Sequence, residues 1–261
     1  MFNIIIPTHD RPALLRRTLQ TLAAQTFTDF HAIIVDDVAP SAPPLDALAA
    51  LQGRYTYVTR SSKPGPAESR NAALALCDRP WLLYIDDDDT MEPGHLAALA
   101  AQVAASQPDI LFHDFKVQNE DRTVMPPRLL EAATPITIAD ASADSVHVLN
   151  RIPNSCLLYR RELIADLRFD TEMIIYEDWD YLLACLKRGK LQYAPGIHSV
   201  VIHKSAAGVA ENMRRGNSRD DLIVPTMLQL YRSHPAPSPA VRQARFTLLS
   251  NAGIPVTLEQ C

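Results

Sequence analysis

The first 117 residues alternate short apolar runs with stretches that carry apolar residues at helical spacing. Leu15, Thr18, Leu19 and Leu22, for example, fall on one face of a helix that starts at Pro12. Near-continuous apolar runs separated by helices are typical of a parallel sheet with helices on both faces. The pattern therefore predicts a mostly parallel α/β fold. The predicted strands are residues 2–6, 31–35, 55–59, 81–85 and 110–117, and further helices are predicted at 45–51, 67–76 and around Leu96 to Val103.

The second half of the chain is patterned less clearly. Residues 119–135 read as irregular and are punctuated by prolines, and a helix starting at Glu177 ends near Gly189. We expect one domain over residues 1–216, with a nucleotide-binding half (1–117) and an acceptor-side half (118–216), followed by a helical extension (217–261). The other predicted elements are strands at 156–159, 191–194 and 199–203, a helix at 139–149, and two C-terminal helices separated by Pro235-Ala236-Pro237.

Polar side chains follow the ends of several predicted strands. Thr8 comes after the first strand, Asp36 and Asp37 after the second, and Asp86 to Asp89 after the fourth. In open α/β sheets, ligands bind at the carboxyl ends of the strands. These residues therefore predict one shared cleft, although an N-cap or loop role for Asp36 is an open alternative.

The most informative motif is the acidic run Asp86-Asp87-Asp88-Asp89, which directly follows an apolar strand. Adjacent carboxylates at the edge of a core repel one another and lose hydration. A divalent cation relieves both effects, because Mg²⁺ and Mn²⁺ prefer hard oxygen ligands. Asp86 and Asp88 also have the Asp-x-Asp spacing of enzymes that bind a nucleotide diphosphate through a metal. The alternative is a solvated acidic turn.

Four further features suggest chemistry. Glu177-Asp178 at a helix start offers a general base, or simply acids that favour a helix N-terminus. Arg70 has a guanidinium suited to a diphosphate, or lies on a helix surface. His203, at a strand end, could complete a metal shell, contact a phosphate or lie in a loop. Arg214-Arg215 could close over phosphates or be solvated.

Composition narrows the class of protein. The net charge of −5 argues against a nucleic-acid binder. The four cysteines show no paired spacing, so we expect them to be reduced in a cytoplasmic protein. No apolar run reaches the ~20 residues of a membrane helix, and because Met1 leads straight into a predicted strand, we expect no signal peptide.

In their order along the chain, the motifs resemble glycosyltransferase family 2. The resemblance covers roughly residues 1–208 and implies the GT-A fold, a Rossmann-like mostly parallel sheet with helices on both faces. It implies an inverting transfer from a nucleotide-diphosphate sugar, with a UDP-sugar favoured, to a hydroxyl of a glycan or lipid-linked acceptor. The segments that carry it are IIIPTHDRPALLRRTLQTLAAQTF, FHAIIVDD, PGPAESRNAAL, WLLYIDDDD, YEDWDYLL and VVIHKSAAGV.

The resemblance also implies roles for the residues of the nucleotide site. Thr8 and Asp37 would contact the nucleobase, and Asp36 would support their loop. His9 stands where an aromatic residue is common in the family, and Arg70 would support the diphosphate.

The resemblance implies a metal and a base as well. Asp86 and Asp88 form the Asp-x-Asp pair that would bind Mn²⁺ or Mg²⁺, with Asp88 in direct contact and His203 near the metal or diphosphate. Asp87 would contact the ribose. Asp178 matches the family's catalytic base.

Other functions and partners stay open on the sequence. A nucleotidyltransferase would favour a glycine-rich basic loop after the first strand, which Pro7-Thr8-His9-Asp10 lacks. A phospho-acceptor receiver module would explain Asp36-Asp37 but not the later acids, and a non-catalytic nucleotide-sugar binder is a further alternative. The C-terminal helices are expected to mediate self-association or peripheral contact with a membrane-bound acceptor complex at the inner face of the membrane. The alternative is that they pack onto the sheet.

Overall fold

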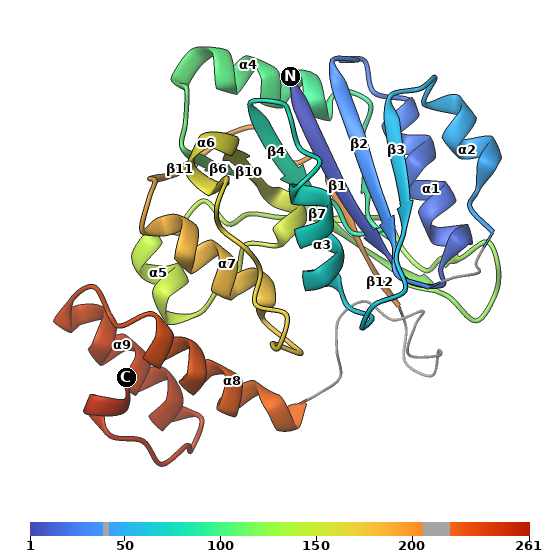
Figure 1. Cartoon of the computed structure of the whole chain (residues 1–261). Coiled ribbons are helices and arrows are strands. Elements are labelled where there is room, and N and C mark those ends of the chain that lie inside the picture. Colours follow the sequence, from blue (N-terminus) through green and yellow to red (C-terminus); the bar gives the residue numbers. More distant parts are fainter. Residues whose placement is uncertain (39–41, 206–219) are drawn as a thin grey trace.

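A central sheet of seven strands, in the order β11-β6-β10-β4-β1-β2-β3, forms the body of the protein (Figure 1). The computed structural model describes residues 1–38, 42–205 and 220–261. All pairings in this sheet are parallel except those of β10, which runs antiparallel between β4 and β6. The strands are β1 (Phe2–Thr8), β2 (Phe30–Asp36), β3 (Tyr55–Thr59), β4 (Trp81–Tyr84), β6 (Ile110–Phe112), β10 (Leu157–Arg160) and β11 (Leu191–Tyr193).

Helices cover both faces of this sheet, as the pattern predicted. In Figure 1, α3 (Pro66–Leu74) and α7 (Glu177–Leu186) lie in front of the strands and α1 (Pro12–Ala23) lies behind them. Every residue of β1 is buried, as expected for a strand covered on two sides. The remaining helices of this region are α2 (Leu45–Ala50), α4 (His95–Ser106), α5 (Ala143–Val148) and α6 (Arg161–Ile164).

A second, smaller sheet was not predicted. Its order is β5-β12-β7-β8, and β9 also pairs with β7. The predicted strand over residues 110–117 is in fact β6 and the start of β7, which belong to different sheets, and the predicted irregular segment holds the end of β7 together with β8 and β9. Strands of two or three residues are too short to show a periodicity. The strands are β5 (Thr90–Met91), β7 (Phe115–Asp121), β8 (Arg128–Leu129), β9 (Thr134–Ile136) and β12 (Val200–Ser205).

The two predicted C-terminal helices are α8 (Asp220–Ser233) and α9 (Pro239–Asn251), which lie below α5 and α7 in Figure 1. Arg245 of α9 is fully buried, and its guanidinium donates to the carbonyl oxygens of His147, His234 and Cys261 at 2.7–3.0 Å. The Tyr231 hydroxyl donates to the carbonyl oxygen of Val148 at 2.6 Å. These contacts fasten the helical pair to α5.

Met227, Leu230 and Tyr231 of α8 are buried, so part of the apolar side of this helix packs within the chain. Among the described residues, no helix has the length and apolar character to cross a bilayer. The expected boundary between residues 216 and 217 lies outside the described residues, and the one between 117 and 118 lies inside β7.

The parallel strands end together at one edge of the central sheet. The register pairs Thr8 with Asp36 and Asp36 with Thr59. The acidic run follows β4, the other parallel neighbour of β1. The predicted strand-end residues therefore come from adjacent strands.

Candidate active site

The turn after β1 is tied to the acidic run and to the end of β2. The Thr8 hydroxyl donates to a carboxylate oxygen of Asp87 at 2.6 Å. His9 places Nδ1 2.6 Å from Oδ1 of Asp37, and its imidazole remains about half exposed. Since a carboxylate only accepts, Nδ1 carries the hydrogen of this bond. Asp10 follows with a φ of 47°, a left-handed conformation that Asp and Asn adopt more readily than most residues.

Asp37 also holds the loop before α3. Its Oδ2 accepts from the backbone N–H of Gly65 at 2.6 Å and lies 3.3 Å from Nη2 of Arg60. Asp36 accepts from the Tyr57 hydroxyl at 2.7 Å. The two carboxylates thus fix the loops of the expected nucleotide edge.

Each of the first three carboxylates of the acidic run has an arginine partner. Asp86 pairs with Arg70 at 3.1 Å. Asp87 pairs with Arg11 at 2.7 Å. Asp88 pairs with Nη1 of Arg122 at 2.8 Å, and Nη1 of Arg11 lies 3.5 Å from the same oxygen. The repulsion that suggested a metal on sequence grounds is thus offset by guanidinium groups of the protein.

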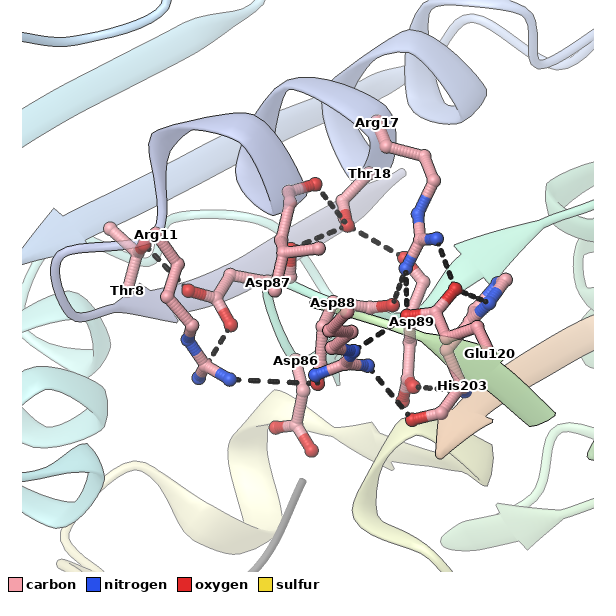
Figure 2. Close-up of polar contacts among 12 residues, drawn as sticks. Thr8, Arg11, Arg17, Thr18, Asp86, Asp87, Asp88, Asp89, Glu120 and His203 are labelled. Atoms are coloured by element: carbon pink, nitrogen blue, oxygen red, sulfur yellow. Dashed lines mark hydrogen bonds and ion pairs between the residues drawn. The ribbon is translucent and has the colours of Figure 1, made fainter. Parts of the chain in front are cut away.

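Asp87 and Asp88 are nearly inaccessible to solvent, with exposures of 0% and 1%. Burial raises the pKa of Asp87 to about 6, since the Arg11 charge offsets only part of the lost hydration and the Asp88 charge adds to it. Figure 2 shows Arg11 pointing toward these carboxylates from the N-terminal end of α1.

Behind the run lies a second buried group centred on Glu120 of β7. Glu120 pairs with Nη1 of Arg17 at 2.6 Å, with Nε of Arg122 at 2.6 Å and with Nδ1 of His203 at 3.0 Å. Burial alone would raise the pKa of Glu120, but the hydrogen bonds from His203, Arg17 and Arg122 outweigh it and lower that pKa to about 2. Arg17 also donates to the carbonyl oxygen of Asp88 at 2.7 Å (Figure 2), so this group supports the backbone of the run.

His203 does not join Asp86 and Asp88 in one ligand set. Its Nδ1 faces Glu120, and its Nε2 lies 2.9 Å from the Thr90 hydroxyl. No group of three His, Cys, Asp or Glu side chains with the geometry of a metal site occurs in residues 1–38, 42–205 and 220–261. Asp88, the expected direct ligand, bonds to Arg122 instead. The described residues, as arranged, do not fit the expected metal site.

The expected general base lies at the start of α7, close to the acidic run. Arg70 is buried and joins the two regions, since Nη1 lies 2.7 Å from Glu177 and Nη2 lies 3.1 Å from Asp86. Asp178 keeps a partly exposed surface, and its Oδ1 accepts from the Trp179 N–H at 2.8 Å.

Lost hydration raises the pKa of Asp178 to about 6, the Glu177 charge raises it further, and the Arg70 charge opposes both. Tyr176, directly before the pair, has a φ of 63°, which is uncommon for a residue with a large side chain. With a pKa of about 6, the Asp178 carboxylate is mostly ionised at pH 7 and is a stronger base than an ordinary aspartate.

The structure thus brings most of the predicted residues together at the carboxyl ends of the parallel strands, with His203 as the exception described above. Sequence reasoning missed Arg11, Arg17, Glu120 and Arg122. The Glu120-x-Arg122 spacing places two charges on one side of an extended segment at the end of β7 and was a usable signal, but the segment read as irregular. Arg214-Arg215 lies outside the described residues.

The chain is similar to known proteins in both sequence and fold. The model of the family described as Glycosyl transferase family 2 matches residues 3–168. The chain is 28% identical over 193 residues to an uncharacterized glycosyltransferase of Haemophilus influenzae, covering 72% of this chain and 62% of that protein. It is 25% identical over 205 residues to the succinoglycan biosynthesis protein ExoW of Rhizobium meliloti, covering 72% of this chain and 64% of ExoW. The chain therefore spans less than two thirds of the length of these two relatives.

Solved structures share the fold, among them the following two. The crystal structure of S. aureus TarS 1-349 in complex with UDP-GlcNAc matches with a TM-score of 0.70 at 17% identity, covering 95% of this chain and 71% of that one. The mannosyltransferase PcManGT from Pyrobaculum calidifontis, in complex with GDP-Man and Mn²⁺, matches with a TM-score of 0.57 at 14% identity, covering 99% and 76%. At such identities the likeness is one of fold alone.

Proposed function

The chain belongs to glycosyltransferase family 2, and we propose that it transfers a sugar from a nucleotide-diphosphate donor to a hydroxyl group, with inversion at the anomeric carbon. The observation that carries the proposal is the Asp86–Arg70–Glu177 bridge, which joins the acidic run to the helix start that holds Asp178. A donor diphosphate near the run would bring its sugar close to a partly exposed carboxylate of raised pKa.

The nucleotide would lie over the strand ends that Thr8, His9, Asp36 and Asp37 fix. His9 is the most exposed of these side chains and can reach a base edge from its position on Asp37. A UDP-sugar is the preferred donor, and the binding of UDP-GlcNAc by TarS, which shares this fold, supports that preference.

The reaction follows from the placement of Asp178. Its carboxylate accepts the proton of the acceptor hydroxyl while the hydroxyl oxygen attacks the anomeric carbon. The bond from that carbon to the diphosphate oxygen breaks, and its electron pair leaves with the nucleoside diphosphate. One displacement inverts the configuration, after which Asp178 loses its proton to water.

A resident Mn²⁺ or Mg²⁺ was expected from the sequence, and bound to Asp88 it would offset charge on the leaving diphosphate. The arginine contacts of Asp88 do not fit that role, so the steps above use side chains alone. For the acceptor, we propose a hydroxyl of a glycan or of a lipid-linked glycan. The name of the relative ExoW, which refers to succinoglycan biosynthesis, supports a polysaccharide.

Binding and turnover of candidate donors test this proposal. Calorimetry with UDP, GDP, ADP and dTDP identifies the base, because the nucleotide whose base fits the site should bind with the highest affinity. Since that nucleotide binds the folded state, it should also raise the melting temperature of the protein. Nucleotide sugars of the preferred base should then release nucleoside diphosphate. A folded protein that binds none of these nucleotides would contradict the proposal.

A further inference from the structure

The positive charges of two arginines beside Asp88 disfavour the binding of a divalent cation there. Nη1 of Arg122 lies 2.8 Å from Oδ2 of Asp88, and Nη1 of Arg11 lies 3.5 Å from the same oxygen. The carboxylate is 1% exposed. A metal ion that bound Oδ2 would have to displace one guanidinium and would be held beside another, and like charges in a buried setting repel strongly.

Arg122 is fixed in place by further bonds. It is fully buried, its Nε bonds to Glu120 at 2.6 Å, and its Nη2 donates to the His203 carbonyl oxygen at 3.1 Å. If Arg122 moved away to admit a metal, the buried Glu120 would lose a partner, and removal of one member of a buried ion pair is strongly unfavourable. Arg122 is therefore held against Asp88 by its contacts with Glu120 and with the His203 carbonyl oxygen.

Arg11 occupies a different position. Its side chain is 18% exposed, and it comes from the same turn as Thr8 and His9. It pairs with Asp87 on one side and approaches Asp88 on the other. A guanidinium offers several directed N–H groups, so it can hold a carboxylate and still donate to a phosphate oxygen.

We infer that Arg122 and Arg11 take the place of the divalent cation at the acidic run. Buried Arg122 neutralises the charge of Asp88, and Arg11 donates hydrogen bonds to the diphosphate of the nucleotide sugar. The inference rests on the proposed function for the identity of the diphosphate. It assigns Arg11 as a substrate-binding residue and Arg122 as a positioning residue, and donor turnover then has no requirement for metal at Asp88.

A titration of Mn²⁺ followed by electron paramagnetic resonance tests the metal part without any activity. UDP itself binds Mn²⁺, so the reference is the same concentration of UDP without protein. Relative to it, wild-type protein should leave the signal of free aqueous Mn²⁺ unchanged up to millimolar protein. Arg122→Gln should bind Mn²⁺ at least ~10-fold more tightly, because Asp88 loses the guanidinium that lies 2.8 Å from its carboxylate. Micromolar Mn²⁺ binding by wild type that Asp88→Asn removes would overturn the inference, whether or not a nucleotide binds.

Because Arg122→Gln leaves buried carboxylates unpaired and can fail to fold, Arg11→Gln provides the second variant. In EDTA it should weaken UDP binding by roughly 10-fold or more, the loss of one charge-assisted hydrogen bond. Arg16→Gln is the matched control, because Arg16 lies on α1, which directly follows Arg11, but pairs with Asp46, and its UDP affinity should equal that of wild type. Equal UDP affinity of Arg11→Gln and Arg16→Gln would contradict the role of Arg11.

Turnover separates this inference from the proposed function. Release of nucleoside diphosphate that falls less than ~3-fold in EDTA supports both. Release that falls by ~100-fold or more and returns with Mn²⁺ supports the proposed function and overturns the arginine assignment. A protein that binds no nucleoside diphosphate contradicts the proposed function, and the Mn²⁺ titration still decides the metal question.

Discussion

The Glu177→Gln substitution tests the electrostatic account of the proposed base, because it removes a negative charge beside Asp178 without removing Asp178 itself. The Glu177 charge raises the pKa of Asp178, and Glu177 also engages Arg70, whose charge lowers it. In the variant both changes lower the pKa of Asp178. The negative charge of Glu177 is removed, and the positive charge of Arg70 is no longer paired with Glu177 and acts more strongly on Asp178. The pKa of Asp178 should therefore fall.

The size of the shift can be bounded. One pKa unit is about 1.4 kcal/mol, the energy of two unit charges ~12 Å apart at an effective dielectric constant of about 20. Adjacent residues at a helix start lie closer than that, while the partial exposure of Asp178 adds screening by water. We expect a fall of about one unit from the wild-type value of about 6.

The assay is the pH dependence of kcat/KM for donor turnover, which reports ionisation in the free enzyme. In wild type, kcat/KM should be half-maximal near pH 6 and should fall about tenfold per unit below it, because only ionised Asp178 accepts a proton. In Glu177→Gln this acidic limb should move to lower pH by about one unit, with a smaller change in the plateau.

Asp178→Asn is the control, and above the acidic limb it should lower kcat by about 10²–10⁴-fold while nucleotide affinity stays near that of wild type. The acidic limb itself should be absent from this variant, because it has no Asp178 to protonate. An acidic limb that stays at the same pH in Glu177→Gln would refute the assignment of that limb to Asp178. A dead Glu177→Gln enzyme beside a nearly normal Asp178→Asn enzyme would reverse the roles of the two acids.

Three other substitutions give sharp expectations. Asp37→Ala should raise KM for the donor more than it lowers kcat, because it loosens His9 and Gly65 in ground and transition states alike; unchanged nucleotide affinity by calorimetry would remove Asp37 from the site. Burial lowers the pKa of His113 to about 4, so its neutral form stabilises the fold fully above pH 6.5 and that contribution is lost as the pH falls toward 4. Urea unfolding at pH 5 should show about 2 kcal/mol less stability from this group than at pH 7, a loss that His113→Asn should largely abolish. Arg245→Met should lower the unfolding free energy by roughly 2 kcal/mol or more, because three buried carbonyl oxygens lose their donor; an unchanged urea midpoint would mean that α8 and α9 are not fastened through Arg245.

The parts of the fold that the sequence predicted are those with a clear period. The strand at residues 55–59 matches β3, and the helix that starts at Glu177 matches α7. The second sheet escaped prediction because its pairs join short segments from distant parts of the chain, such as β5 and β12. The antiparallel direction of β10 depends on the path of the chain between strands, which an apolar pattern does not record.

For the candidate site, the sequence predicted which residues follow the strands but not which side chains pair with them. Spacing and position relative to strands placed Thr8, Asp37 and Asp86 at one edge of the sheet, because parallel strands end together. Charge compensation could not be predicted, because it depends on tertiary contacts. Arg122 lies 34 residues beyond Asp88 in the sequence, yet their side chains bond at 2.8 Å.

Release of nucleoside diphosphate from a panel of nucleotide sugars is the most direct test of the central claim, a sugar transfer that uses Asp178 as its base. The panel is run with wild type and Asp178→Asn in the presence of a polysaccharide or lipid-linked glycan acceptor. The account predicts that at least one nucleotide sugar yields nucleoside diphosphate with wild type, at a rate that Asp178→Asn lowers by about 10²-fold or more. Equal rates for the two proteins, or no release from any donor by a folded wild type, would contradict it.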